Sequence, residues 1–265
     1  MKRVFVFGVV FMLGLVGVAS AQEDLDAITW LAYEKTESGK SRELIGASIK
    51  DDGPMYDEML KNGTLSSWGI AVPINHHLSD DWNYMLWATM AGWGDVQKLQ
   101  GGFQQMFSTR TPEQMMENQK VYDEATVDGA HHDAIIRHHA GHLGSPDGEV
   151  APKYFHISYW KVAPEGFDGM IGFFKDNVAP ILAKHHADGS IASYGISTQE
   201  LHGDSSWTHV SWYTVSELAA IDAVGKSLDE GLADVDMGPI MSAMDWDSHR
   251  DQVLVIVHLG GMSEE

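Results

Sequence analysis

The chain of 265 residues lacks cysteine altogether, which excludes disulfide bonds, thiol nucleophiles and thiolate metal sites. Its stability must therefore come from the burial of apolar side chains. Basic residues are also scarce, because 17 Lys and Arg stand against 38 Asp and Glu, for a formal net charge of −21. A surface of this sign repels nucleic-acid backbones and anionic lipids. We therefore expect small-molecule ligands or soluble partners, and neither a nucleic acid nor a membrane surface.

Several common catalytic motifs are absent as well. The sequence contains no P-loop, no nucleophile elbow, no dinucleotide fingerprint after a predicted strand and no H-E-x-x-H zinc motif. The sequence motifs therefore identify neither a reaction nor a cofactor. Function has to be inferred from the fold and from the side chains that the fold brings together.

The first 21 residues have the pattern of a secretory signal peptide. Lys2 and Arg3 precede an apolar run at 4–18, and three small residues follow it at 19–21. The run is shorter than the roughly 20 residues that span a bilayer. We therefore expect cleavage after Ala21, export to the periplasm or the extracellular space, and a mature chain that is no longer attached to the membrane.

The remaining sequence contains an internal duplication. The stretch "KNGTLSSWGI" at 61–70 resembles "ADGSIASYGI" at 187–196, an offset of 126 positions. Aromatic residues match at offsets of 126 or 125: Tyr33 with Tyr159, Trp82 with Trp207, and Trp87 with Trp212. We predict a first unit at residues 22–143, a linker containing Gly and Pro at 144–152, and a second unit at 153–265.

Each unit shows the same order of predicted elements, which is strand, helix, strand, strand, helix, strand. Alternating and β-branched runs predict the strands, and apolar residues at three- and four-residue steps predict the helices. In the second unit the predicted strands fall at 154–161, 190–198, 206–215 and 252–259, and the helices at 166–186 and 216–229. Pro180 predicts a kink or a break in the first of these helices. The first unit gains an extra helix at 111–125 and ends in a strand at 132–140.

This element order is that of a ferredoxin-like βαββαβ unit. The duplicated chain resembles the dimeric α/β-barrel superfamily, which includes antibiotic-biosynthesis monooxygenases, EthD-like and NIPSNAP-like proteins and, more distantly, chlorite-dismutase-like haem proteins. The resemblance covers nearly all of the mature chain and rests on element order and duplication, without a catalytic motif. It implies an α+β fold in which two tandem units pair their antiparallel sheets into one α/β barrel. A homodimer of such chains is a further expectation.

Strand alternation predicts which side chains enter the barrel. If the aliphatic residues of the second unit lie under its helices, the opposite face carries His156, His209 and His258. Antiparallel pairing would place the side chains of His156 and His258 within about 8 Å of each other. Imidazole titrates near neutral pH, so we take these three histidines as candidate acids or bases, although sheet histidines are more often hydrogen-bonded packing residues.

The same reasoning selects an aromatic lining for the lumen. The candidate ligand-binding residues are Trp30, Glu34, Tyr84, Trp160, Tyr213 and His138. Such a lumen suits a small, largely apolar ligand, and the resemblance implies an oxygenase- or lyase-type enzyme. Two alternatives stay open. One is a haem- or metal-binding protein with a lumen histidine as ligand, and the other is a non-catalytic carrier or sensor.

A histidine-rich stretch, "HHDAIIRHHAGH" at 131–142, is the densest group of metal-binding side chains. It lacks the spacing of a zinc site. His138 and His139 would point to opposite faces of a strand, so they cannot bind one ion together. We therefore predict no metal ligands in this stretch, and we expect one of its residues, His138, to face the lumen.

Overall fold

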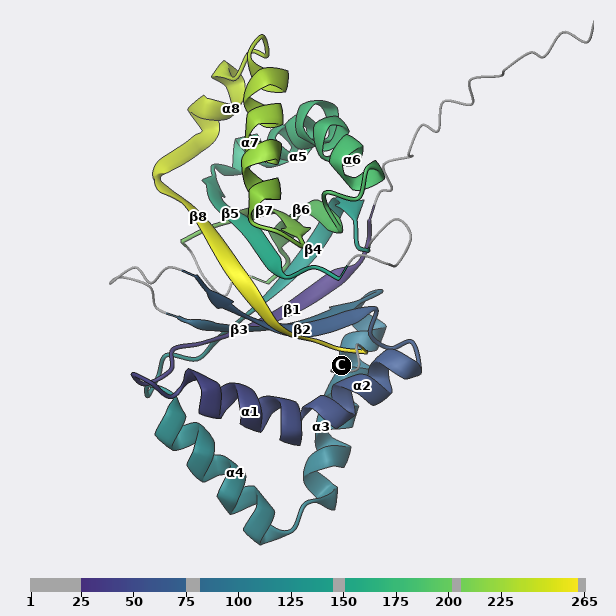
Figure 1. The fold of residues 1–265 in the computed structure, drawn as a ribbon, viewed down its shortest axis with the longest axis vertical. Coiled ribbons are helices and arrows are strands. Elements are labelled where there is room, and N and C mark those ends of the chain that lie inside the picture. The colour runs from purple at the N-terminus through teal and green to yellow at the C-terminus, as the bar shows by residue number, and fades with distance from the viewer. Residues whose placement is uncertain (1–24, 75–81, 145–150, 202–205, 262–265) are drawn as a thin grey trace, which may run out of the picture.

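The computed structural model describes residues 25–74, 82–144, 151–201 and 206–261, and it shows one closed antiparallel barrel (Figure 1). The first half of the chain contributes β1 (Ile28–Glu34), α1 (Ser41–Asp51), α2 (Gly53–Lys61), β2 (Ser67–Pro73), β3 (Tyr84–Met90), α3 (Trp93–Thr109), α4 (Pro112–Ala125) and β4 (His132–His142). The second half contributes β5 (Tyr154–Val162), a 3-10 turn, α5 (Phe167–Phe173), a π-helical turn, α6 (Ala179–Ala187), β6 (Ser193–Gln199), β7 (His209–Val215), α7 (Ala219–Leu232), α8 (Gly238–Ala243) and β8 (Met244–Leu259).

The order of strands around the barrel is β1-β3-β2-β8-β5-β7-β6-β4. Each half therefore has the ferredoxin-like order, with its first strand between its third and its fourth. The barrel closes because the second strand of each half pairs with the fourth strand of the other, β2 with β8 and β6 with β4. The predicted fold class, two tandem ferredoxin-like units that form an α/β barrel, is confirmed. The predicted signal peptide and residues 145–150 of the predicted linker lie outside the described residues.

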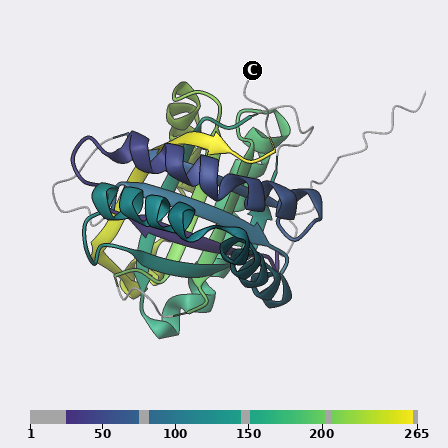
Figure 2. The ribbon, with the colours of Figure 1, turned by 90° about the horizontal axis from the view of Figure 1, so that it is seen from below.

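The helices lie outside the barrel, in two groups. Helices α1–α4 cover one side and α5–α8 cover the opposite side, as Figures 1 and 2 show. Each sheet thus has an outer face under helices and an inner face that borders the lumen. Within the described residues, no helix is both long enough and apolar enough to cross a membrane.

Two local predictions about helices are confirmed. The extra helix of the first unit is α4, which begins with a capping box between Thr111 and Gln114. The α-helix is broken near Pro180 by a π-helical turn at Phe174–Val178, directly before α6. Proline cannot donate the hydrogen bond of a regular helix and its ring crowds the preceding turn, so the chain widens there.

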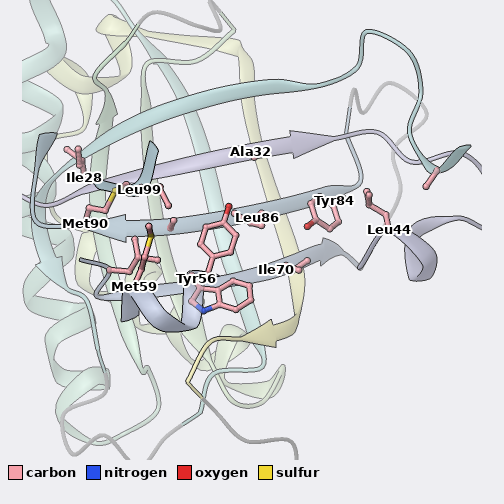
Figure 3. Close-up of a cluster of buried hydrophobic side chains, with 14 residues drawn as sticks. Ile28, Ala32, Leu44, Tyr56, Met59, Ile70, Tyr84, Leu86, Met90 and Leu99 are labelled. Atoms are coloured by element: carbon pink, nitrogen blue, oxygen red, sulfur yellow. The ribbon is translucent and has the colours of Figure 1, made fainter. Parts of the chain in front are cut away.

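Three apolar clusters stabilise this arrangement. One lies between the first sheet and helices α1–α3 (Figure 3), and a second lies between the second sheet and its helices. The third fills part of the lumen with side chains from both halves. Because both faces of each sheet are buried against apolar side chains, a strand in this barrel does not have a clearly polar face.

The duplicated aromatic residues meet inside the barrel. The hydroxyl oxygens of Tyr33 and Tyr159 lie 3.3 Å apart, although these matching residues are 126 positions apart in the sequence. Trp82 packs on Tyr33 and Trp207 packs on Tyr159, with ring centroids 4.9 and 5.4 Å apart. All four side chains are almost fully buried and fill the part of the lumen toward the ends of β1 and β5.

Candidate ligand-binding site in the barrel lumen

The other part of the lumen contains a cavity of about 410 Å³. Both halves of the chain line it, with Thr29 and Leu31 from β1 and Phe155 and Ile157 from β5. Further lining residues include Ser67, Trp87, Thr89, Ile136, His138, Ser193, Val210, Trp212, Thr214 and Ile256. None of the described lining residues is Asp, Glu, Lys or Arg. The cavity is therefore uncharged and mostly apolar, with a few hydroxyl groups and one imidazole.

Two tryptophans face this cavity, and each lies against a glycine of the neighbouring strand. Trp87 is the cross-strand partner of Gly69, and Trp212 is the partner of Gly195. A Cβ atom on Gly69 would lie 2.4 Å from the Trp87 ring, and one on Gly195 would lie 3.0 Å from the Trp212 ring. Only glycine leaves room for both indoles. The two glycines stand in the repeated stretches of sequence, so the repeat has a physical role in shaping the cavity.

Five polar side chains of the lumen form one connected network around His138. Its Nε2 atom lies 2.7 Å from the hydroxyl of Thr29, which lies 2.8 Å from the hydroxyl of Thr89. On the other side, its Nδ1 atom lies 2.8 Å from the hydroxyl of Ser197, and the Trp212 indole donates to the same hydroxyl over 3.4 Å. These groups are all buried, so the network satisfies polar atoms that water cannot reach.

Burial also sets the charge of His138. The side chain is 3% exposed, and desolvation lowers its pKa to about 3. His138 is therefore neutral at ordinary pH, with one ring nitrogen as donor and the other as acceptor. A neutral imidazole held by two hydroxyl groups can orient a ligand or its neighbours, but it accepts a proton only weakly.

The network occupies one of two equivalent positions in the duplicated barrel. Thr29 pairs with Ile136 on β4 just as Phe155 pairs with Leu254 on β8, so His138 corresponds to Ile256. The residues equivalent to Thr29 and Ser197 are Phe155 and Ala71. The network therefore occurs on one wall of the lumen only, because apolar residues occupy the matching positions of the other wall. That second wall shows that the barrel closes without such a network.

Three solved structures of similar fold cover most of this chain. One is described as a candidate monooxygenase from Lactobacillus acidophilus, with a TM-score of 0.56, 13% identity and coverage of 90% of this chain and 96% of that chain. Another, from Fusobacterium nucleatum, carries the same kind of description, with a TM-score of 0.56, 10% identity and coverage of 91% and 98%. An anthrone oxidase-like protein has a TM-score of 0.53, 14% identity and coverage of 89% and 93%.

These likenesses extend over nearly the whole length of each chain. This chain has the dimeric α/β-barrel fold. No protein-family model matches its sequence, and the comparison with curated proteins gave no match. At 14% identity or less, the likeness shows the fold and does not assign an activity to the tandem barrel.

The tandem barrel places most of the predicted lumen residues of the second unit on its outer face. His156 stacks on Tyr213, with ring centroids 4.7 Å apart, and Tyr213 belongs to the cluster under the second group of helices. His209 contacts Phe167 of α5 and bonds its carbonyl oxygen. Trp160 stacks on His249 at 3.8 Å. These residues do share one face of the sheet, as predicted, but the predicted lumen placement is wrong.

The physical reason is that aliphatic side chains are needed on both faces of a barrel sheet. The aliphatic side chains of β5 and β7 were expected under the helices, whereas Ile157, Val210 and Trp212 lie in the lumen. A shift of one residue in that assignment moves every side chain to the other face. The polarity of the side chains did not show which face borders the lumen. The histidine and serine side chains of the outer face are covered by helices and by neighbouring side chains, so neither face is exposed to water.

His258 is displaced for a different reason, a β-bulge in β8. Ile70 pairs with His258 and Ala71 pairs with Ile256, which leaves Val257 as the extra residue. Before the bulge, Leu254 and Ile256 face the lumen. The bulge turns His258 outward, where its ring packs 4.5 Å from Trp68. The predicted approach of His156 and His258 is therefore wrong, since the register places His156 beside Val253.

Three residues of the first unit were also predicted in the lumen and lie outside it. Trp30 packs against Phe103 of α3. Tyr84 lies in the cluster of Figure 3, and its hydroxyl donates to Ser48 of α1 over 3.0 Å. Glu34 bonds the exposed His131 over 2.6 Å. The reason is again the parity of the strands, because the inward residues of β1 are Thr29, Leu31 and Tyr33.

His138 is the predicted ligand-binding residue that the barrel does place at the cavity. As predicted, His139 points to the opposite face, where it bonds Thr198 over 2.7 Å. A second bulge, at His139, lies at the position equivalent to the bulge at Val257. Across the described residues, no group of three His, Asp or Glu side chains is arranged to hold a metal ion.

Proposed function

We propose that the protein binds a small, largely apolar molecule in the barrel lumen, with the His138 network as its polar contact. The observation that carries this proposal is the mostly apolar cavity of about 410 Å³ that has the His138 network on one of its two equivalent walls. Small-molecule sites typically have volumes of roughly 300–1,000 Å³ and a mostly apolar lining with a few placed polar groups. A polar network on one wall gives such a cavity a direction, so a ligand would bind in one orientation.

A variant that fills the cavity tests this proposal. Ile256→Trp adds an indole to the lumen, and we expect it to weaken the binding of indane, a small apolar probe, by about tenfold or more, because the added ring occupies the space of the ligand. Quenching of tryptophan fluorescence or calorimetry would measure the affinity.

The matched control is Val257→Trp. This neighbouring side chain is 39% exposed and stands at the bulge, so the same substitution leaves the lumen unchanged. Equal affinity for indane in both variants and in the wild type would contradict a site in the lumen, and failure of the wild type to bind any apolar probe would contradict the proposal as a whole.

An enzymatic role for the lumen has less support. The expected oxygenase- or lyase-type chemistry required His156, His209 or His258 as acid or base, and none of these side chains lines the cavity. His138 does, but a base is most effective when its pKa is near the working pH, and burial holds the pKa of His138 at about 3. The network therefore supports binding and orientation better than proton transfer.

Haem binding through this histidine does not fit the residues present. Both ring nitrogens of His138 already take part in hydrogen bonds, to Thr29 and to Ser197. Coordination of an iron atom would break one of these buried hydrogen bonds, each of which contributes about 0.5–1.5 kcal/mol. We therefore derive no chemistry from a haem group.

Export of the protein is part of the same proposal. We expect the mature protein from its native host to begin at Gln22, because the apolar run at 4–18 ends in small residues suited to signal peptidase. N-terminal sequencing of the protein from a periplasmic or secreted fraction would check this. Recovery of Met1 on protein from the cytosol would contradict it.

A further inference from the structure

The hydrogen bonds of the lumen network have a defined direction, which starts at Trp212. The indole N–H can only donate, and its acceptor is the hydroxyl oxygen of Ser197 at 3.4 Å. Ser197 is fully buried, so its own hydrogen needs an acceptor inside the protein. The second group near it is Nδ1 of His138, at 2.8 Å. A hydroxyl hydrogen without a partner would be costly there, so Ser197 donates to Nδ1.

This direction continues through the imidazole ring. His138 is neutral and carries one ring hydrogen. Because Nδ1 accepts from Ser197, the hydrogen sits on Nε2, which donates to the hydroxyl oxygen of Thr29 at 2.7 Å. Thr29 in turn donates its hydrogen to the hydroxyl oxygen of Thr89 at 2.8 Å.

Thr89 is the last member of the chain of hydrogen bonds. In the described part of the protein, Thr29 is the only hydrogen-bond partner of its hydroxyl, and that bond uses the oxygen of Thr89 as acceptor. The side chain lines the cavity, so its hydrogen is available to a bound molecule. The equivalent residue of the second unit, Thr214, is paired instead with the hydroxyl of Ser193 at 2.6 Å.

We infer that the lumen selects a neutral ligand with a carbonyl-type oxygen, which accepts a hydrogen bond from the hydroxyl of Thr89. This inference rests on the proposed binding function. The ligand is neutral because none of the described side chains that line the cavity is charged, and an anion buried without a cation would carry a large desolvation cost. A ligand group that can only donate would leave the hydrogen of the Thr89 hydroxyl without an acceptor.

Two probes of almost the same shape test the inference on the full chain. Indane is apolar, and 1-indanone adds one carbonyl oxygen to the same ring system. In Thr89→Val, which keeps the shape of the side chain and removes the hydroxyl, we expect the Kd of 1-indanone to rise about tenfold, the equivalent of about 1.4 kcal/mol. The Kd of indane should change less than twofold. Calorimetry would give both values.

Thr214→Val is the matched control, because it removes the equivalent hydroxyl from the opposite wall of the same cavity. We expect it to leave the ratio of the two affinities unchanged. A second measurement uses the wild-type protein and does not depend on any variant. The infrared carbonyl stretch of bound 1-indanone should move to lower frequency than in an apolar solvent, because the oxygen accepts a hydrogen bond.

The outcomes separate this inference from the proposed function. If neither probe binds the wild type, the proposed function fails. If both probes bind but the carbonyl stretch is unshifted, or Thr89→Val changes both affinities equally, binding in the lumen stands and the assignment of Thr89 as donor is overturned. A selective loss of affinity for 1-indanone in Thr214→Val would also overturn it, because the donor would then lie on the other wall.

Discussion

Replacement of Gly69 by alanine should destabilise the protein by about 3 kcal/mol, the upper range for overpacking a close-packed interior. A Cβ atom there would lie 2.4 Å from the Trp87 ring and 2.6 Å from the carbonyl oxygen of His258. The indole can move only into the cavity, and the carbonyl belongs to the backbone of the neighbouring strand. The variant should therefore lose both stability and affinity for indane. Urea unfolding at constant pH would measure the change in free energy.

Gly225→Ala is the control for this substitution. Gly225 lies within α7, and a Cβ atom there would have nothing within 4 Å. Alanine is a better helix former than glycine, so the variant should be more stable by about 0.5–1 kcal/mol. A Gly69→Ala protein that unfolds within about 0.5 kcal/mol of the wild type would show that the barrel wall is not close-packed at Trp87, contrary to the usual rule for interiors.

The second large effect concerns stability in acid. His138 binds a proton less readily in the fold, where its pKa is about 3, than in the unfolded chain, where it is near 6.5. Its contribution to stability is therefore complete above pH 6.5 and is lost as the pH falls toward 3, at about 1.4 kcal/mol per pH unit. His138→Gln keeps a donor and an acceptor but does not titrate. Between pH 4 and 6, roughly the range below the ordinary histidine pKa, its unfolding free energy should fall less steeply than that of the wild type by this slope.

Other histidines provide the comparison for this experiment. Burial lowers the pKa of His209 to about 4, so the His138→Gln protein should keep part of its acid sensitivity. Hydrogen bonds to Asp133 and Glu34 raise the pKa of His131 to about 10, so His131 is protonated in both folded and unfolded chains below pH 6. His131→Gln should therefore leave the acid slope unchanged. Parallel curves for the wild type and His138→Gln would contradict a buried, neutral His138.

The architecture could be predicted from the sequence because its signals are local or repeated. Alternation, helical periodicity and the matched pairs Trp82 with Trp207 and Tyr33 with Tyr159 specify two copies of one unit. Such a unit has a second sheet face that must be covered, and a second copy of the same sheet covers it. The extra helix α4 also has a local signal, because its capping residues stand at its start in the sequence.

The site could be predicted only in part. The duplicated stretches around Gly69 and Gly195, together with the matched Trp87 and Trp212, were visible in the sequence and mark the walls of the cavity. Their meaning was not visible, because a glycine opposite a tryptophan is a cross-strand relation that requires the register. The sequence did not indicate that Thr29, Thr89 and Ser197 line the lumen, because the residue type does not show whether a hydroxyl group is buried or exposed.

The sequence by itself determined the two units, their element order, the acidic surface and the absence of thiol chemistry. Tertiary structure alone decided which face of each strand borders the lumen. Both faces are buried and aliphatic in a barrel, so a shift of one residue is equally compatible with the pattern, and a bulge such as the one at Val257 reverses the alternation within a strand. For this reason His138 reached the cavity as predicted, while His156, His209 and His258 came to lie against the surrounding helices and aromatic rings.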